Sequence, residues 1–423
     1  MKKSTLTLLL TWSAFMAFAQ TGKLNYAVSF ARFQQLYNEQ KADSVFLTFA
    51  PVLRSALPLE KTRETIASLY SQVGKLRKAE VWKETAENVS YKAEFEKATL
   101  VVIYSLNDKN EVQGLFLQPY QDPAAEPKAP GIEYTVATEN GSPISGTLLM
   151  PETKERVPVV LIIAGSGPTD RDCNSTQGIH SNAYRMLADS LAAHNIASLR
   201  YDKRGVAKSR KAMLSEADLR IEDLVNDVVA YVTKLRGSGS FSGIYLLGHS
   251  EGSLIAMLAA QKVKIDGLIS VAGAGTPADE VLLRQLKDGY PDLYEQSVPI
   301  LKQLKEGKQV PIEEMKLQQL FGASIQPYMI SWIKYDPRVE LRKLKVPVLI
   351  LQGNTDLQVQ VADANNLKAA RPDASLQILD QMNHILKTAP ADPAQNGATY
   401  NDPKLPLHQG LVKAVVGFAA PKP

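Results

Sequence analysis

The spacing of apolar residues divides the chain into three regions. From Leu24 to Gly74 they recur at intervals that place them on one face of a helix, and Gly74 stands where a helix C-cap is expected. Between Val81 and Leu117 the period changes to two, which is typical of strands with one buried face. Helices followed by an antiparallel sheet predict a small α+β domain over residues 20–117.

Closely spaced prolines separate this domain from the rest of the chain. They are Pro119, Pro123, Pro127 and Pro130. Such a stretch favours an extended polyproline II conformation, so residues 118–130 are predicted to be a linker. Residues 131–423 are predicted to form one larger domain.

Beyond the linker, apolar strands and helices alternate, as a parallel sheet requires. The first two strands are predicted to form a hairpin around Asn140-Gly141. Strands are predicted over residues 132–137, 144–150, 157–163, 197–201, 244–247, 267–271, 346–351 and 376–379. Helices are predicted over residues 182–194, 221–235 and 408–418, and one more begins at 251. The pattern predicts an α/β fold in which helices cover both faces of a mostly parallel sheet.

An insertion with helical spacing interrupts this alternation over about residues 275–342. It follows the strand over residues 267–271, so we expect it to form a helical cap over the edge where the strands end. Its aromatic residues Tyr328, Trp332 and Tyr335 are candidates to line an acyl or aryl pocket. Residues with this spacing more often form the core of the cap itself.

The first residues have the layout of a secretory signal peptide. Lys2 and Lys3 precede an apolar run over residues 6–18, and Ala17-Phe18-Ala19 supplies the small residues of a cleavage site. Residues 1–19 are therefore predicted to be removed and the protein to be exported to the bacterial periplasm or beyond. The alternative is a membrane anchor, for which the run is short, and no second such run follows.

The net charge and the few cysteine and histidine residues bear on which partners and metals the protein is expected to bind. The formal net charge is +4 and falls by two without Lys2 and Lys3, so nothing points to nucleic acid or an anionic membrane. Cys173 is the only cysteine, and none of the five histidines occurs in H-E-x-x-H spacing. We therefore expect no disulfide within the chain, no metal and no cofactor. The sequence leaves the oligomeric state undetermined.

The segment Gly248-His249-Ser250-Glu251-Gly252 carries the most specific signal in the chain. It lies between a predicted strand and a predicted helix, which is the context of a nucleophile elbow. In such a turn, neighbouring backbone comes too close to the glycine positions for a Cβ atom. Ser250 is therefore predicted to be a nucleophile, and Gly248 and Gly252 are predicted to be required sterically.

A serine hydroxyl needs a base within hydrogen-bond reach and a carboxylate that orients the base. Asp356 follows the strand over residues 346–351, and His384 follows the strand over residues 376–379. They occur in the order Ser, Asp, His that this kind of elbow requires. The predicted triad is Ser250, Asp356 and His384, with Asp380 as a second candidate for the acid.

A tetrahedral intermediate needs two backbone donors aimed at its oxyanion. One is predicted to be the N–H of Glu251, directly after the nucleophile, and the other the N–H of Ser166, in the loop after residues 157–163. The Glu251 side chain also suits a helix N-terminus. Asp202 and Arg204 are expected to form a structural ion pair near the pocket.

Several of these segments resemble a known family. Residues 248–252, 353–356 and 383–384 are similar to the triad segments of the serine aminopeptidase-like and dienelactone-hydrolase-like branch of the α/β-hydrolases. Residues 165–172 and 201–205 resemble loops of bacterial esterases on that branch. The resemblance extends from Gly131 to the C-terminus except for the insertion. It implies the α/β-hydrolase fold and does not define the substrate.

Ala164 stands where many relatives carry His before Gly, which leaves the orientation of that loop open. The region over residues 20–117 resembles, in its order of elements, the small domain of unknown function that precedes some bacterial α/β-hydrolases, with a layout like the nuclear-transport-factor fold. It contains no nucleophile, base or ligand cluster, and a docking or substrate-gating role is expected.

Three functions fit these features. The first is an exported esterase that forms an acyl-enzyme on Ser250 and acts on a small-molecule ester. The second is an aminopeptidase or acyl-peptide hydrolase acting on a short peptide, which needs a carboxylate for the free amine; Glu251, Glu313 and Glu314 are candidates. The third is a binding protein that keeps the fold without the chemistry.

Overall fold

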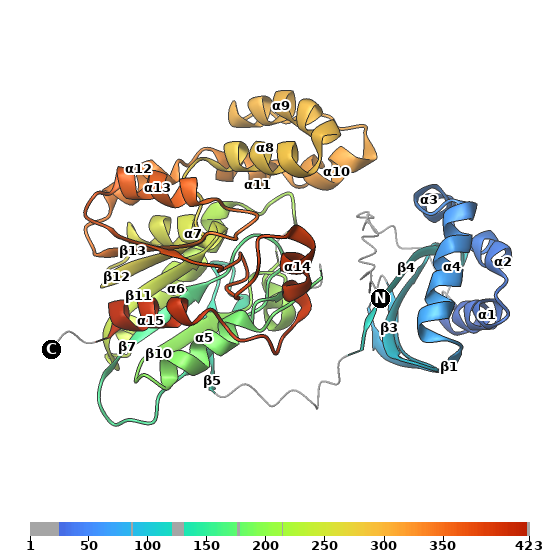
Figure 1. Cartoon of the computed structure of the whole chain (residues 1–423), viewed down its shortest axis with the longest axis horizontal. Helices are drawn as coiled ribbons and strands as arrows, with labels where there is room; N and C mark the ends of the chain where they lie inside the picture. The colour runs from blue at the N-terminus through green and yellow to red at the C-terminus, as the bar shows by residue number, and fades with distance from the viewer. Residues whose placement is uncertain (1–24, 86–87, 121–130, 176–177, 214, 421–423) are drawn as a thin grey trace. The chain divides into compact units, whose positions relative to one another are not determined.

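The computed structural model describes residues 25–85, 88–120, 131–175, 178–213 and 215–420 (Figure 1). The predicted signal peptide and residues 121–130 of the predicted linker lie outside the described residues. Residues 25–120 belong to one compact unit, and those from 131 onward belong to another. No helix in these described ranges combines the length and apolar character needed to cross a membrane.

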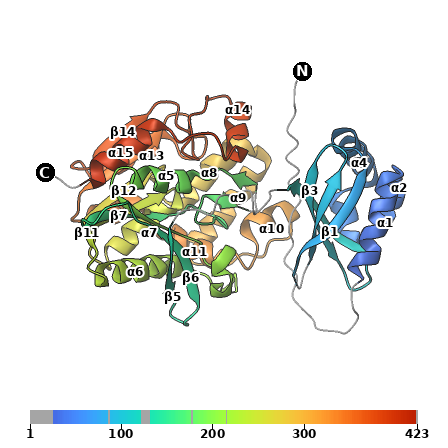
Figure 2. The same cartoon turned by 90° about the horizontal axis from the view of Figure 1, so that it is seen from below.

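The N-terminal unit packs helices on an antiparallel sheet. Its helices are α1 (Tyr26–Asn38), α2 (Ala42–Leu47), α3 (Pro51–Ala56) and α4 (Leu59–Val73). Its strands are β1 (Leu76–Glu84), β2 (Val89–Phe95), β3 (Thr99–Leu106) and β4 (Val112–Pro119), paired in that order. Gly74 ends α4 at a φ of 77°. The helices lie on one face of the sheet (Figures 1 and 2), where Phe30 and Tyr91 stack with ring centroids 3.8 Å apart.

Strand β1 begins at Leu76, earlier than the sequence pattern predicts. It is an edge strand, and after Leu76 almost every residue of β1 is exposed. Charged residues such as Arg77, Lys78 and Glu80 therefore occupy both faces of the strand. Without a buried face there is no alternation of apolar and polar residues to detect.

The second unit is built on an eight-stranded sheet with the order β5-β6-β10-β7-β11-β12-β13-β14. The strands are β5 (Ile132–Ala137), β6 (Pro143–Leu149), β7 (Val157–Ile163), β10 (Ala197–Tyr201), β11 (Phe241–His249), β12 (Gly267–Val271), β13 (Val348–Gly353) and β14 (Ser375–Leu379). The pairs β5–β6 and β6–β10 are antiparallel, and the other neighbours are parallel. This order confirms the prediction of an α/β-hydrolase fold.

Helices cover the two faces of this sheet, and each face has its own apolar core. One core includes residues of α6 (Ile221–Gly237), α7 (Glu251–Ala260), α12 (Pro337–Lys343) and α13 (Val361–Ala370). The other includes residues of α5 (Ala183–Ala192) and α15 (Gln409–Ala419). Strand β7 contributes Val159 and Leu161 to the first core and Val160 and Ile162 to the second. Burial on both faces explains its continuous apolar sequence.

Four helices of the insertion form a cap. They are α8 (Ala278–Gly289), α9 (Pro291–Lys305), α10 (Met315–Phe321) and α11 (Gln326–Ile333). They enclose a core of their own and form a separate layer in Figure 1. An ion pair of 2.7 Å between Arg284 and Asp363 joins the cap to α13. Helix α12, the last part of the predicted insertion, contributes Leu341 to the main core instead.

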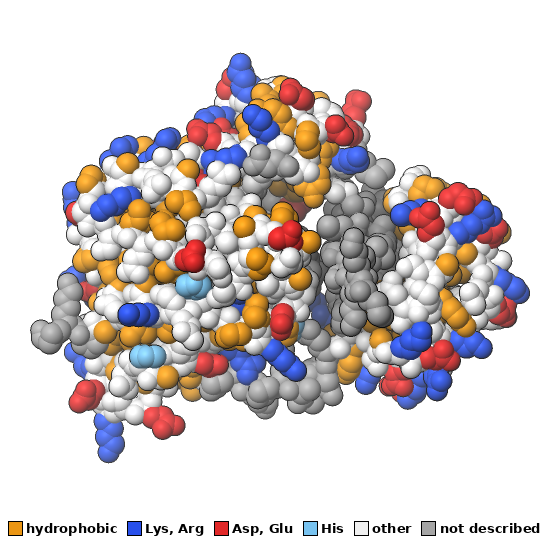
Figure 3. All heavy atoms as spheres, viewed as in Figure 1, with side chains coloured by type: hydrophobic (Ala, Val, Ile, Leu, Met, Phe, Trp, Pro, Cys, Tyr) orange, Lys and Arg blue, Asp and Glu red, His pale blue; other side chains and the backbone are white. Residues whose placement is uncertain are grey.

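The surface of the second unit has charges of both signs. On the face shown in Figure 3, lysine and arginine side chains are interspersed with aspartate and glutamate. This distribution agrees with the small net charge of the whole chain.

Candidate active site

Ser250 occupies a sharp turn between β11 and α7. Its backbone has φ 55° and ψ −122°, which a residue with a side chain rarely adopts. Its N–H donates a hydrogen bond of 2.9 Å to the carbonyl of Val271, at the end of the neighbouring strand. The turn therefore has the strained geometry of a nucleophile elbow.

The glycines on either side of Ser250 allow this turn. A Cβ atom on Gly248 would lie 2.3 Å from the carbonyl oxygen of Gly252 and 2.5 Å from the Cα of Ser253. A Cβ atom on Gly252 would lie 2.3 Å from the carbonyl oxygen of Ile163. All these neighbours are backbone atoms, so no side-chain movement could relieve the overlap.

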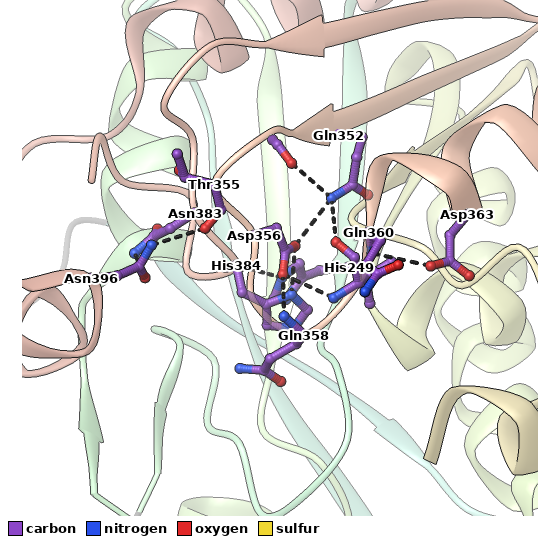
Figure 4. Close-up of polar contacts among 12 residues, drawn as sticks. His249, Gln352, Thr355, Asp356, Gln358, Gln360, Asp363, Asn383, His384 and Asn396 are labelled. Atoms are coloured by element: carbon purple, nitrogen blue, oxygen red, sulfur yellow. Dashed lines mark hydrogen bonds and ion pairs between the residues drawn. The ribbon is translucent and has the colours of Figure 1, made fainter. Parts of the chain in front are cut away.

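His384 and Asp356 form a buried pair near this turn. The Nδ1–H of His384 donates to Oδ2 of Asp356 at 2.8 Å, which leaves the lone pair of a neutral imidazole on Nε2 (Figure 4). Oδ1 of Asp356 accepts from the N–H groups of Gln358 and Val359 at 2.8 and 3.0 Å. Burial opposes the charge of Asp356, but His384 and these hydrogen bonds outweigh it and lower the carboxyl pKa.

The residue before Ser250 holds the backbone of His384. Nε2 of His249 lies 2.8 Å from the carbonyl oxygen of His384, and its Nδ1 lies 2.7 Å from the hydroxyl of Tyr184. A carbonyl only accepts, so His249 carries its proton on Nε2 and accepts from Tyr184 at Nδ1. The two imidazole rings lie 4.8 Å apart. His249 thus connects the elbow directly to the loop of the base.

Buried amides tie the loops of the acid and the base together. Nδ2 of Asn383 donates to Thr399 Oγ1 at 2.8 Å and to Asn396 Oδ1 at 3.2 Å. Asn396 in turn donates to the carbonyl of Thr355 at 2.9 Å (Figure 4). Gln352 donates to Asp356 Oδ2 at 3.3 Å. The sequence singled out Asn383 only as part of a segment that resembles a family, and it gave no sign of these contacts of Asn396 and Gln352. An isolated Asn or Gln has no pattern that separates it from a surface residue.

The two predicted oxyanion donors belong to two segments that meet at Ser250. A Cβ atom on Gly165 would lie 3.0 Å from the Cβ of Ser250, so the loop after β7 contacts the elbow. The N–H groups of Ser166 and Glu251 donate no hydrogen bond to a described residue. The Ser250 hydroxyl also has no hydrogen-bond partner within the described ranges. The hydrogen bond between a catalytic serine and its base is often long in an unliganded enzyme and shortens when substrate binds.

The remaining predicted residues take different places. Glu251 is buried, and its carboxylate contacts Lys203 at 3.1 Å and Tyr328 at 2.6 Å. Tyr328 and Trp332 are neighbours, with ring centroids 6.1 Å apart. Tyr335 donates instead to Glu222 of α6 at 2.7 Å. All three aromatic residues pack against the main core of the second unit, and Trp332 also packs against the core of the cap. A common pocket stays a prediction.

Asp202, Arg204 and Asp380 have other partners than predicted. The predicted ion pair between Asp202 and Arg204 is wrong: Asp202 pairs with Arg171 at 2.7 Å, and Arg204 pairs with Asp227 at 2.7 Å. Asp380, the second candidate for the acid, is exposed and accepts from Asn354 at 2.8 Å. Asp356, not Asp380, is the carboxylate that contacts His384.

The described residues contain no group of three or more His, Cys, Asp or Glu side chains that could hold a metal ion.

The burial of His249 predicts an effect of pH on stability. Burial lowers the pKa of His249 to about 3, whereas an unfolded histidine titrates near 6.5. Between these values the unfolded chain binds a proton that the folded protein does not, so the free energy of unfolding falls as pH falls. A difference of one bound proton changes the free energy of unfolding by at most about 1.4 kcal/mol per pH unit. We expect His249→Gln to reduce this slope in urea unfolding measured from pH 7 to pH 4.

The control for this experiment is His194→Gln, because His194 is exposed. It should leave the slope of the wild type unchanged. If the free energy of unfolding changed with pH equally in the wild type and in His249→Gln, His249 would not be the source of the pH dependence.

The close approach at Gly252 predicts a steric effect on stability. Gly252→Ala forces a Cβ against the backbone of Ile163 and should lower stability by at least about 1–3 kcal/mol. The matched control is Gly417→Ala in α15, where a Cβ would meet nothing within 4 Å. That change should stabilise by about 0.5–1 kcal/mol, because alanine favours a helix. Melting temperatures measure both, and a Gly252→Ala variant as stable as the wild type would contradict the prediction.

Comparison with known families agrees with the two units. The family described as "Serine aminopeptidase, S33" matches residues 177–342, a range that contains Ser250 and the cap but ends before Asp356 and His384. A family of unknown function, DUF3887, matches residues 31–115 in the N-terminal unit.

Individual proteins are also similar to this chain. Esterase EstD from Thermotoga maritima is 27% identical over 318 residues, which cover 71% of this chain and 72% of that protein. Est1E from Butyrivibrio proteoclasticus has a TM-score of 0.40 at 16% identity, over 64% of this chain and 95% of its own. XC6422 from Xanthomonas campestris, described as a serine hydrolase without lid, has a TM-score of 0.41 at 16% identity, over 70% and 98%. The two structural likenesses do not bear on the chemistry of this chain.

The order of the strands is that of the α/β-hydrolase fold. The second unit is similar to the serine aminopeptidase family over residues 177–342, and the N-terminal unit is similar to the DUF3887 family over residues 31–115.

Proposed function

We propose that this protein is a serine hydrolase that cleaves carboxylic esters through an acyl-enzyme on Ser250. The observation that carries the proposal is the buried pair of His384 and Asp356, which His249 connects to the elbow through a hydrogen bond of 2.8 Å. The carboxylate selects the tautomer in which Nε2 of His384 can accept a proton.

In the first half of the reaction, Ser250 Oγ bonds to the ester carbonyl carbon while its proton passes to Nε2 of His384. The carbonyl oxygen becomes an oxyanion, which the N–H groups of Ser166 and Glu251 stabilise. The bond from carbon to the alcohol oxygen then breaks, and that oxygen takes the proton from His384. The alcohol leaves, and the acyl group remains on Ser250.

In the second half, a water molecule attacks the acyl carbon and gives one proton to His384. When the intermediate collapses, the bond to Ser250 breaks and Oγ recovers that proton. The carboxylic acid leaves, and the site returns to its initial state.

An aminopeptidase is the second candidate, because the family match carries that description. Such an enzyme needs a carboxylate available to a free amine. Glu251 is occupied by Lys203 and Tyr328, and Glu313 and Glu314 are exposed on the segment before α10. The similarity to an esterase that covers 71% of this chain also supports the ester substrate.

The choice is testable with short-chain nitrophenyl esters beside aminoacyl nitroanilides. We expect ester turnover that Ser250→Ala and His384→Ala each reduce by several orders of magnitude. Asp356→Asn should reduce kcat by about 10⁴-fold, because it permits the wrong tautomer of His384. The control is Asp380→Asn, which should retain the rate of the wild type. A preference for the anilide would favour the aminopeptidase, and ester turnover that survives Ser250→Ala would disprove the mechanism.

We further propose that the enzyme acts outside the cytoplasm. Lys2, Lys3 and the apolar run over residues 6–18 support this, with small residues at Ala17 and Ala19. N-terminal sequencing of the protein from the periplasm or medium should begin near Gln20. If the protein from the periplasm or medium still began at Met1, the predicted signal peptide would be wrong.

A further inference from the structure

Lys203 lies at the junction of the two segments that supply the proposed oxyanion donors. It follows β10, and only 7% of it is exposed. Its Nζ donates to the carbonyl oxygen of Gly165 at 2.8 Å and pairs with Oε2 of Glu251 at 3.1 Å. A buried ammonium is costly unless it is paired and hydrogen-bonded, so these two contacts hold it in place.

The contact with Gly165 determines which way the next N–H points. The carbonyl of Gly165 and the N–H of Ser166 belong to one planar, trans peptide unit, so they point in opposite directions. By holding the carbonyl, Lys203 directs the N–H of Ser166 away from itself. Gly165 precedes this peptide and Gly167 follows Ser166 with φ 80°, so the backbone here has few steric limits of its own.

The other partner of Lys203 leads to the cap. Oε1 of Glu251 accepts a hydrogen bond of 2.6 Å from the hydroxyl of Tyr328, which lies on α11. Burial raises the pKa of Tyr328 well above its usual value, so the phenol remains a donor. One continuous set of contacts therefore runs from the cap through Glu251 and Lys203 to Gly165.

We propose that Lys203 is a positioning residue for the oxyanion hole and that the cap holds it in place through Tyr328 and Glu251. This inference rests on the proposed serine mechanism. Lys203 does not contact the substrate; it fixes the donor that does. If the cap contacts bound substrate, that contact acts through Tyr328, Glu251 and Lys203 on the N–H of Ser166, which stabilises the transition state.

The test uses Lys203→Met in the full-length protein, with two readouts. The first is kcat and KM for a short-chain nitrophenyl ester. The second is the rate at which a fluorophosphonate labels Ser250, where a bond from Oγ to phosphorus forms, fluoride leaves and the serine proton passes to His384. The phosphoryl oxygen occupies the oxyanion hole in this reaction, so labelling reports the hole without ester hydrolysis.

Removing one oxyanion donor costs about 10²–10³-fold in kcat. Lys203→Met keeps the donor but frees its direction, so we expect kcat and the labelling rate to fall by about 10- to 100-fold. KM should change by less than about threefold, because the lost interaction acts in the transition state. Tyr328→Phe leaves Lys203 paired and should give a smaller fall in both rates. Lys208→Met is the matched control, because Lys208 is exposed and pairs with Glu133.

A second variant separates positioning from stability. Lys203→Met leaves the Glu251 carboxylate buried without its cation, which should lower the melting temperature. In Lys203→Met/Glu251→Gln that charge is absent, so the melting temperature should recover while both rates stay low. Recovery of the rates together with the melting temperature would overturn the inference, and so would an unchanged labelling rate in Lys203→Met.

The labelling readout also distinguishes this inference from the proposed function. If the wild type is labelled but does not hydrolyse esters, the ester assignment is wrong, and the labelling rates of the variants still decide the role of Lys203. If the wild type is not labelled at all, both proposals are overturned.

Discussion

The backbone of Ser250 is held at φ 55° and ψ −122°, and most of the site depends on the surroundings that maintain this strain. Strand β11 lies between β7 and β12, and the Ser250 N–H is bonded to Val271 of β12. Helix α7 begins directly after Ser250 and is buried from Glu251 to Ala259. A turn of this kind costs about 1–3 kcal/mol, which burial of one apolar helix against the sheet can offset. The strain is thus maintained by packing on both sides of the turn.

The residues on either side of Ser250 extend this rigid turn to the rest of the site. The side chain of His249 donates a hydrogen bond to the backbone of His384 and so holds the loop of His384 beside the elbow. Glu251 bonds to Lys203 and Tyr328, and through them the loop after β7 and the cap are connected to the elbow. The two positions beside Ser250 therefore connect the elbow to different parts of the fold. In the proposed mechanism, His249 positions the base, and Glu251 positions the loop that supplies an oxyanion donor.

The sequence predicts most of the second unit because its strands are buried on both faces. Strand β7 is apolar throughout, and its predicted limits agree with the structure. The prediction fails where the pairing partner is distant. Asp202 and Arg204 are two residues apart beyond the end of β10, and each pairs with a different segment, Arg171 in one case and Asp227 in the other. Such partners follow from tertiary packing, which no local spacing encodes. The contacts of Asn383 escaped detection for the same reason.

The loop after β10 contains three consecutive buried charges, and each pairs with a different part of the fold. Asp202 binds the backbone and guanidinium of Arg171, Lys203 binds the carbonyl of Gly165 and Glu251, and Arg204 binds Asp227 on α6. Buried ion pairs add little net stability, because desolvation cancels much of their attraction. Their geometry, however, is strict. Asp202 contacts the loop over residues 165–172 near one end, and Lys203 contacts it near the other. Two charged side chains that follow β10 therefore hold this loop beside Ala164, which has no polar side chain of its own.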